Sequence, residues 1–592
     1  MLSAVTHSNR ERIDLAGYWQ FRTDPRNVGE AERWFASSGP GGWDVLFVPA
    51  CWNEQLAAYD GYMGAAWYRR RVYVPASWSG RRVHLVVQGA LLSATVWVNG
   101  REVSQHEGGF TPFEVDISND VKAGSDNWII VRVDDTVTLE TIPQGTGQNQ
   151  LHIDWYNWGG LYRPVYLEAI TPLHLDDLTI RTLDASRPQA IVQIQGRVAG
   201  PGHEQATVRL ALRDPQGRVV AQAAPALTIS NGGTQFNQTW TISEPQLWTP
   251  DEPTLYTLQV DVQQREVVQD HVEFACGLRT IEIRDRQLLM NGRPFFQKGI
   301  SRVEDAPMQG RASWGPVLRR DYDLLKSCGA NIYRPAGYFP SIPDVMLADQ
   351  LGICVILDLP TYGKVLPESL EDPKLLAKVQ RWVREAVAVY KNHPSVILWD
   401  LGTEIRAITE GGKRYVQTLY DLVRELDPTR PVFYISHCLV YKQDKAQGIV
   451  DMLCLWIGQR LHEDWEEGAR LIDEQVEYMH KRYPEKPMII YFGDVAIAGM
   501  HSDPPRWYSE EFQERYFAWA WEYAQTKPYI VGFWWWCLCD YRCRPSSSVN
   551  GLLRWGIYDR MRQPKLATRL IRQTYHAHPS LAPEGETALD RR

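Results

Sequence analysis

The feature that most constrains the fold is a repeated alternation between apolar runs and helical stretches, which begins after Arg279. Short apolar runs bounded by turn residues are typical of buried parallel strands, and amphipathic segments between them are typical of crossover helices. Eight such runs occupy residues 295–301, 331–337, 354–360, 396–404, 431–437, 452–458, 487–493 and 530–539. Eight strand–helix units in about 300 residues predict a (β/α)8 TIM barrel, which we assign to residues 278–580.

One of the intervening helices is marked clearly at its start. Apolar residues recur from Leu375 to Tyr390 at the spacing of one helix face. Asp372, followed by Pro373, supplies an N-cap and a favourable residue for the first turn. We therefore expect an amphipathic helix that begins at Pro373 and packs on the barrel.

The residues before the barrel alternate polar and apolar side chains over short runs divided by turn residues. This spacing predicts a jelly-roll β-sandwich over residues 1–172 and an immunoglobulin-like β-sandwich over residues 173–277. The pair Asn99 and Gly100 lies between two such runs and predicts a tight hairpin. A polar tail, residues 581–592, completes the predicted organisation.

Charge and cysteine content limit the partners and the compartment. The 592 residues carry a formal net charge of −8 without a basic block, which argues against binding to nucleic acid or to an anionic membrane. No uncharged apolar run approaches the roughly 18 residues of a membrane helix, and residues 1–12 lack the apolar core of a secretory leader. The nine cysteines are an odd number, and we expect reduced thiols in the cytoplasm.

The fourth predicted strand ends in acidic residues. The apolar residues from Val396 to Trp399 are followed by Asp400, and Glu404 comes shortly after it. A (β/α)8 barrel places its chemistry at the C-terminal ends of its strands. We therefore expect Asp400 to emerge at the rim of the barrel and Glu404 to belong to the functional site.

Several motifs occur in the order typical of one enzyme family. Segment 157–165 (NWGGLYRPV) closes the first predicted sandwich, segment 291–299 (NGRPFFQKG) opens the barrel, and segment 391–395 (KNHPS) leads into the fourth strand. Further motifs are 497–505 (IAGMHSDPP), 556–558 (GIY) and 562–565 (RQPK). On these motifs the chain resembles glycoside hydrolase family 2, the β-glucuronidase and β-galactosidase group, over nearly its whole length.

The resemblance implies an active site with two glutamates. Family members are retaining glycosidases in which one glutamate protonates the leaving oxygen and the other attacks the anomeric carbon, with the carboxyl groups roughly 5–5.5 Å apart. Glu404 falls at the acid/base position, but Thr403 replaces the asparagine that normally binds the sugar 2-hydroxyl. At the nucleophile position the chain has Tyr491, and Asp494 follows just past the strand end.

The missing nucleophile leaves several mechanisms open. Asp494 is a candidate base on water or a displaced nucleophile, and a wide separation from Glu404 favours inversion. Tyr491 is a candidate nucleophile, although a phenol needs a neighbouring base at neutral pH. A third alternative is a non-hydrolytic acid/base enzyme of the lyase or isomerase type that keeps Glu404. A fourth is a carbohydrate-binding pseudoenzyme.

The resemblance also implies substrate-binding positions. Asp154 matches an aspartate that in β-glucuronidases reaches from the first sandwich into the sugar site. Trp536 matches the tryptophan that forms the floor of that site. Arg554 stands where β-glucuronidases have an Asn-x-Lys motif, so glucuronide specificity is doubtful, although an arginine there can meet an anion. The remaining candidates stand at or near strand ends two to six: Arg334, Asp358, Thr403, His437 and Trp456.

The changes from the family pattern share a direction. Polar groups that grip a sugar are replaced by Val303, Gly337, Trp456, Leu553 and Trp555. A pocket lined in this way is more apolar than the family's, so we expect a small-molecule glycoside or hydrophobic conjugate as substrate. No ligand cluster or phosphate-binding loop predicts a metal or an organic cofactor. The resemblance implies a homo-oligomer, since family members often form dimers or tetramers.

Overall fold

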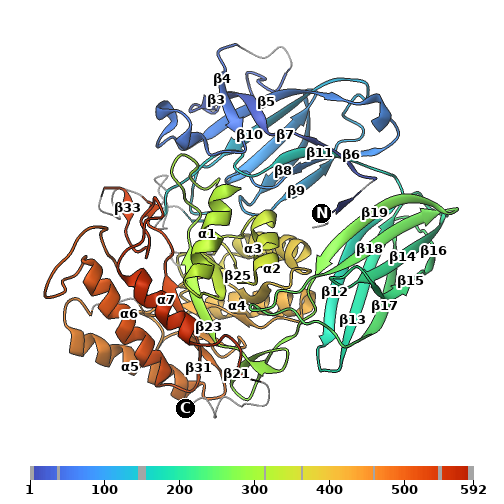
Figure 1. Ribbon diagram of the computed structural model, residues 1–592. Coiled ribbons are helices and arrows are strands. Elements are labelled where there is room, and N and C mark those ends of the chain that lie inside the picture. Colours follow the sequence, from blue (N-terminus) through green and yellow to red (C-terminus); the bar gives the residue numbers. More distant parts are fainter. Residues whose placement is uncertain are drawn as a thin grey trace.

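The computed structural model describes residues 6–7, 9–36, 41–144, 155–312, 315–361, 365–457, 461–543 and 550–583. Two β-sandwiches lie against a barrel that contains every α-helix of this part of the chain (Figure 1). The N-terminal sandwich and the second sandwich contact different sides of the barrel (Figure 1). The predicted fold class, two sandwiches followed by a TIM barrel, is confirmed.

The N-terminal sandwich packs a six-stranded sheet on a four-stranded one around an apolar core. The larger sheet has the order β4 (Asp44–Val48), β3 (Gly17–Asp24), β5 (Ala65–Val74), β10 (Ser125–Asp134), β7 (Ser93–Val98) and β8 (Arg101–Glu107). The smaller has the order β2 (Glu11–Asp14), β11 (Val165–Ile170), β6 (Arg82–Val87) and β9 (Phe113–Asp116). Asn99 and Gly100 form the predicted tight turn between β7 and β8, both with positive φ.

The second sandwich has two antiparallel sheets, and in β13 and β18 buried residues alternate with more accessible ones, as the sequence pattern predicts. One sheet contains β1 (Thr6–His7), β19 (Val267–Cys276), β18 (Tyr256–Gln264), β14 (Gln205–Arg213), β15 (Val219–Ala223) and β16 (Ala226–Thr228). The other contains β12 (His174–Asp184), β13 (Gln189–Ala199) and β17 (Thr234–Ser243). We propose domain boundaries after residues 172 and 277, which fall between β11 and β12 and between β19 and β20.

The barrel follows a small sheet of β20 (Ile281–Arg284), β21 (Gln287–Met290) and β22 (Arg293–Pro294). Its parallel strands are β23 (Gln297–Arg302), β24 (Ile332–Pro335), β25 (Cys354–Asp358), β26 (Val396–Asp400), β27 (Val432–Phe433), β28 (Ile435–Ser436), β29 (Leu453–Trp456), β30 (Met488–Gly493) and β31 (Ile530–Trp536). Tyr434 separates β27 from β28, which together form the fifth strand and close the ring. All eight predicted strands are confirmed.

In the described part of the chain, seven α-helices surround the barrel: α1 (Pro316–Ser327), α2 (Ile342–Leu351), α3 (Pro373–Tyr390), α4 (Glu410–Leu426), α5 (Trp465–Arg482), α6 (Glu510–Gln525) and α7 (Ala567–Ala577). The prediction for α3 is confirmed, because Asp372 accepts a hydrogen bond from the Lys374 N–H and Pro373 is the first helical residue. The fifth strand is followed by turns instead of a helix. Asp444 holds these turns through bonds from Ser436 Oγ and the Ala446 N–H.

Two further predictions concern thiols and membranes. All nine cysteines are free, and reduced thiols stay a prediction. Among the helices in the described ranges, none is long and apolar enough to span a bilayer.

Candidate functional site

Glu404 stands on a tight turn immediately beyond β26. Gly402 has φ +139, and a Cβ at that position would collide with Thr361, whose hydroxyl donates to the Leu401 carbonyl at 2.8 Å. Glu404 itself has φ +55 and is half-buried. A left-handed backbone costs a residue with a Cβ roughly 1–2 kcal/mol, so the surroundings must hold this turn in place. The turn at Glu404 is therefore held in place by its neighbours at the mouth of the barrel.

A buried ionic cluster lies beneath this turn. Arg334, at the end of β24, donates to Asp358 and, at 3.0 Å, to Asp400. The Thr403 hydroxyl joins the cluster by donating to Asp358 at 3.1 Å and contacting Arg334. Asp400 also accepts from the Gly402 N–H at 3.0 Å. Strands two, three and four are thus joined to the turn that carries Glu404.

Asp400 was expected at the rim, and this expectation is wrong. Its side chain is 0% exposed, because the guanidinium of Arg334 on a neighbouring strand compensates its charge inside the barrel. Arg334 and Asp358 are equally buried, at 1% and 0%. We therefore expect these three residues to act on a ligand through the Glu404 turn rather than by touching it.

The electrostatic balance of the cluster is unequal, since one guanidinium faces two carboxyl groups. Burial raises the pKa of Asp358 to about 6, although the nearby Arg334 opposes this rise. Burial and then the charge of Asp358 raise the pKa of Asp400 well above its ordinary value. The pair therefore keeps a proton to a higher pH than two free aspartates would.

Tyr491 lies inside the barrel near the end of β30. Its side chain is 2% exposed, its hydroxyl donates to Ser301 Oγ at 2.7 Å, and the Arg334 guanidinium lies 5.4 Å from the ring centroid. Burial raises the pKa of the phenol. No carboxylate of the described residues forms a hydrogen bond with this hydroxyl. Within the described ranges, the Tyr491 hydroxyl therefore donates to Ser301 and to no carboxylate, and its ring lies beside Arg334.

Aromatic residues continue from Tyr491 across strands six to eight. Trp456 contacts Tyr491 edge to face at 4.7 Å between centroids and reaches Trp555 at 6.3 Å. Trp536 lies 6.3 Å from Tyr491 on the other side. Trp456 and Trp555 are half-buried, so part of this aromatic wall faces outward. The predicted residues Trp456, Tyr491 and Trp536 are therefore neighbours in space.

Asp494 lies past the end of β30, near helix α6. Phe492 packs on Tyr516 of α6, outside the barrel, while Tyr491 points inward. The Asp494 carbonyl accepts from Gln513 of α6 at 2.8 Å. Its carboxylate accepts from the Val495 N–H at 2.7 Å and from Trp507 Nε1 at 3.3 Å. Burial raises the pKa of Asp494 to about 7.

The three remaining predicted residues have different positions. Arg554 directly follows β33 (Leu552–Leu553), and its Nε is buried without a hydrogen-bond partner among the described residues. Its carbonyl accepts from the Ala496 N–H at 2.9 Å. His437 Nε2 lies 3.3 Å from a guanidinium nitrogen of Arg406. Asp154 lies outside the described residues.

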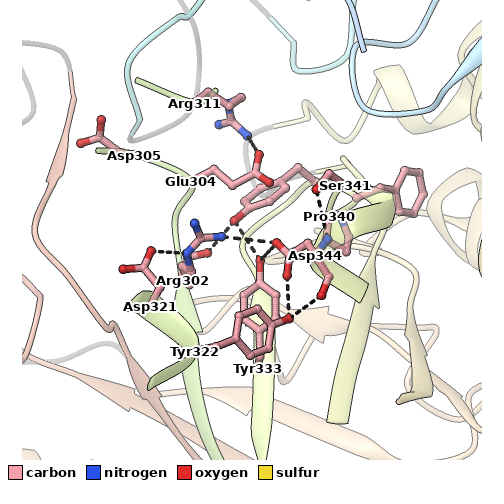
Figure 2. A network of polar contacts seen from close by, with 12 residues as sticks. Arg302, Glu304, Asp305, Arg311, Asp321, Tyr322, Tyr333, Pro340, Ser341 and Asp344 are labelled. Carbon is pink, nitrogen blue, oxygen red and sulfur yellow. Dashed lines mark hydrogen bonds and ion pairs between the residues drawn. The ribbon is translucent and has the colours of Figure 1, made fainter. Parts of the chain in front are cut away.

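A second buried ionic network fixes the ends of strands one and two (Figure 2). Arg302 pairs with Asp321 at 2.7 Å and with Asp344 at 3.4 Å, and all three side chains are almost fully buried. Figure 2 shows Glu304 turned toward Arg311, the two lying 3.9 Å apart. This network adjoins Ser301, which supports the Tyr491 hydroxyl. The described residues contain no group of three or more His, Cys, Asp or Glu arranged for a metal ion.

Sequence reasoning did not single out Ser301, Thr361 or Trp507. Ser301 is the second-last residue of β23, so its place at a strand end was a usable signal. Thr361 and Trp507 lie on connections, and their contacts with the turn and with Asp494 depend on tertiary structure. No local pattern marks residues of this kind.

Comparison with protein families covers nearly the whole chain. A model described as "Glycosyl hydrolases family 2, sugar binding domain" matches residues 13–171. "Glycosyl hydrolases family 2" matches residues 173–279, and "Glycosyl hydrolases family 2, TIM barrel domain" matches residues 281–578.

Individual relatives agree with this assignment. A β-glucuronidase of Paenibacillus borealis is 31% identical, over 96% of this chain and 97% of the relative's length. A β-glucuronidase of Canis lupus familiaris is 33% identical, covering 97% of this chain and 92% of its own. Among solved structures, a β-glucuronidase from an uncultured Clostridium sp. has a TM-score of 0.89 and 26% identity, covering 98% of this chain and 100% of the other.

Proposed function

The chain belongs to glycosyl hydrolases family 2, enzymes that act on O-glycosyl bonds, and from this premise we propose that it hydrolyses a β-linked sugar conjugate with Glu404 as the proton donor. One observation carries the proposal. Glu404 is a half-buried carboxyl group on a left-handed turn at the C-terminal end of a barrel strand, where this fold places its chemistry. The buried cluster beneath the turn supports the same role, because it holds the donor's backbone in place.

We propose that water, rather than a protein carboxylate, attacks the anomeric carbon. By the motif resemblance Tyr491 stands for the usual nucleophile, but its pKa is raised by burial and its hydroxyl donates to Ser301. A neutral phenol is a poor nucleophile. Attack by water on the face opposite Glu404 inverts the anomeric configuration.

Asp494 is our candidate for the base that activates this water. Its pKa of about 7, raised by burial, suits a group that accepts a proton near neutral pH. Its place beside α6 argues for a bridging water or a movement of the Trp507 loop, because its carboxylate accepts hydrogen bonds from Trp507 and Val495. Asp494→Asn tests this role: it should lower kcat while leaving binding of the conjugate unchanged.

The substrate we propose combines an anionic group with an apolar aglycone. Arg554 offers a buried Nε that has no hydrogen-bond partner in the described part of the chain, next to the half-buried Trp555. Apolar side chains stand on connections after strands three and five, where Leu366 and Leu439 are 39% and 77% exposed. The relatives are β-glucuronidases, which supports a sugar acid as the glycone.

A panel of aryl β-glycosides tests the function. We expect turnover of aryl conjugates of acidic sugars, faster for larger apolar aglycones, with one oxygen taken up from labelled water. Faster hydrolysis of simple alkyl pyranosides would contradict the apolar site. An unsaturated sugar formed without uptake of water would support a lyase instead. Tight binding without turnover, unchanged in Glu404→Gln, would support a carbohydrate-binding protein.

We further propose that the protein works in the cytoplasm. All nine cysteines are free and eight of them are buried, which fits a reducing compartment. Activity that is unchanged by reductants, together with nine titratable thiols after denaturation, is the expected result.

A further inference from the structure

We propose that the N-terminal sandwich shapes the substrate pocket through Arg542, a positioning residue that holds the hairpin carrying Leu553 and Arg554. The inference rests on the proposed function for the role of Arg554. The effect of Arg542 on the hairpin is tested separately from that function. Nothing in the family assignment gives Arg542 this role.

Arg542 belongs to a short hairpin beside the aromatic wall. β32 (Tyr541–Arg542) pairs antiparallel with β33, so that Arg542 lies opposite Leu552 and Tyr541 lies opposite Leu553. The Cys543 N–H donates to the Gly551 carbonyl at 3.0 Å and extends the pairing. β33 lies on the side of the barrel below the N-terminal sandwich (Figure 1).

The side chain of Arg542 is held mainly by the N-terminal sandwich. Its guanidinium lies 4.1 Å from the ring centroid of Tyr156 and 5.4 Å from that of Trp158. It pairs with Asp60, and at 3.4 Å with Glu54. A guanidinium that stacks on aromatic faces and bonds to carboxylates has little freedom to turn.

The backbone of Arg542 is held from both domains as well. Its N–H donates to Asp305 of the barrel at 2.7 Å, and its carbonyl accepts from the Tyr156 N–H at 3.0 Å. The Tyr156 hydroxyl donates to Asp60 at 2.9 Å, which links the contacts of the Arg542 backbone to those of its side chain. Asp305 is shared with Arg560, which also reaches Glu54 at 3.2 Å.

The hairpin passes this restraint to Arg554. Tyr541 packs edge to face on Trp536 at 5.8 Å between centroids, and Leu553 leads directly into Arg554 and Trp555. On the far side, Arg554 and Trp555 are tied to the barrel by their carbonyls, which accept from the N–H groups of Ala496 and Cys537. Arg554 is thus fixed at one end by the barrel and at the other by the N-terminal sandwich.

The charges of this junction make the hold sensitive to salt. Three carboxylates, those of Glu54, Asp60 and Asp305, meet the two guanidinium groups of Arg542 and Arg560. Asp60 is 51% exposed and Arg542 is 23% exposed, so dissolved ions reach the pair. Screening by salt should therefore loosen the hairpin in the wild type.

Hydrogen exchange followed by mass spectrometry tests the hold without a substrate. In Arg542→Met we expect peptides within 538–543 and 550–555 to exchange about tenfold faster, the effect of losing one strong pair. Raising the salt from about 0.05 M to 0.5 M should speed their exchange in the wild type and not in Arg542→Met. Arg542→Lys should recover part of the protection. Arg515→Met is the matched control, because Arg515 stacks on Trp465 at 4.1 Å elsewhere on the barrel.

Kinetics then test the consequence for the pocket. Arg542→Met and Asp60→Asn should each raise KM for an anionic conjugate by about tenfold with little change in kcat, and the double variant should match the singles. Exchange and KM within twofold of the wild type in Arg542→Met would overturn the proposal. Faster exchange throughout both domains would also overturn it, because it would show a general structural role. If the wild type has no glycosidase activity, the exchange experiment still decides whether Arg542 holds the hairpin.

Discussion

The two halves of the barrel mouth differ in the kind of side chain that fills them. Strands two to four contribute Arg334, Asp358 and Asp400, a buried ionic cluster beneath the Glu404 turn. Strands six to eight contribute Trp456, Tyr491 and Trp536, which contact one another as rings. The ionic cluster thus lies on one half and the aromatic wall on the other, with Asp494 just past the end of β30.

This difference explains what the site can do. The ionic half holds the backbone turn that carries Glu404, which supports our proposal that this residue donates a proton to a leaving oxygen. The aromatic half offers flat apolar surface, which suits packing on a sugar face or on an apolar aglycone. This combination is the basis of our proposal of acid-assisted hydrolysis by water without a covalent glycosyl-enzyme.

The largest effect is expected from removing the proton donor. Glu404→Gln should lower kcat by about 10²–10⁴-fold, the usual contribution of a general acid. Glu410→Gln is the matched control, since Glu410 is an exposed residue at the start of α4 that pairs with Lys445. Steady-state kinetics on an aryl conjugate provide the measurement. Equal activity of the two variants would show that Glu404 is not the general acid, and the functional difference between the two halves would then be unsupported.

The next largest effect concerns the stability of the ionic half. Arg334→Met leaves two buried carboxyl groups without their cation and should cost about 3–5 kcal/mol of unfolding free energy at pH 7. The loss should shrink at pH 4, where the carboxyl groups are protonated. Thermal unfolding at both pH values measures it. A loss that is the same at pH 4 and pH 7 would show that packing, rather than charge, dominates.

Much of this architecture could be predicted from the sequence, because hydrophobic periodicity specifies strands and helices locally. The eight apolar runs and the capped start of α3 were predicted in this way. The burial of Asp400 was not, since it depends on Arg334 approaching from another strand. The bonds between Trp507 and Asp494, and between Tyr491 and Ser301, join residues far apart in sequence or on separate elements. Periodicity carries no information on such pairs.

The pH dependence of stability tests the charges of the ionic half more sharply. A carboxyl group whose folded-state pKa is raised stabilises the fold below its ordinary pKa of about 4, and this stabilisation is lost as pH rises through the folded-state value. For Asp358 that value is about 6, and for Asp400 the shift has the same direction. Asp400→Asn should therefore flatten the fall in stability between pH 4 and pH 8 and stabilise the protein at pH 8 by about 1 kcal/mol.

Urea unfolding at intervals of one pH unit provides the measurement. Asp421→Asn is a suitable control, because Asp421 lies on the outer surface of α4, where Gln417 donates to its carboxylate. A wild-type stability that rises from pH 4 to pH 8, with Asp400→Asn unchanged in slope, would contradict the proton-sharing cluster.

The smallest effect is expected in the aromatic half. Tyr491→Phe removes one hydrogen bond to Ser301 and should change kcat by no more than about fivefold, the worth of about 1 kcal/mol. A covalent role for the phenol predicts a loss of several orders of magnitude instead. Measuring kcat of Tyr491→Phe beside that of Glu404→Gln shows how unequally the two halves contribute to the reaction rate.

The anomeric configuration of the first product tests the central claim most directly. Proton NMR during the first turnovers of a β-linked aryl conjugate reports whether the released sugar appears as the α or the β anomer. Attack by water opposite Glu404 predicts the α anomer first, followed by slow mutarotation. If the β anomer appears first, the reaction has passed through a double displacement with a covalent intermediate, and the account given for Tyr491 and Glu404 is contradicted.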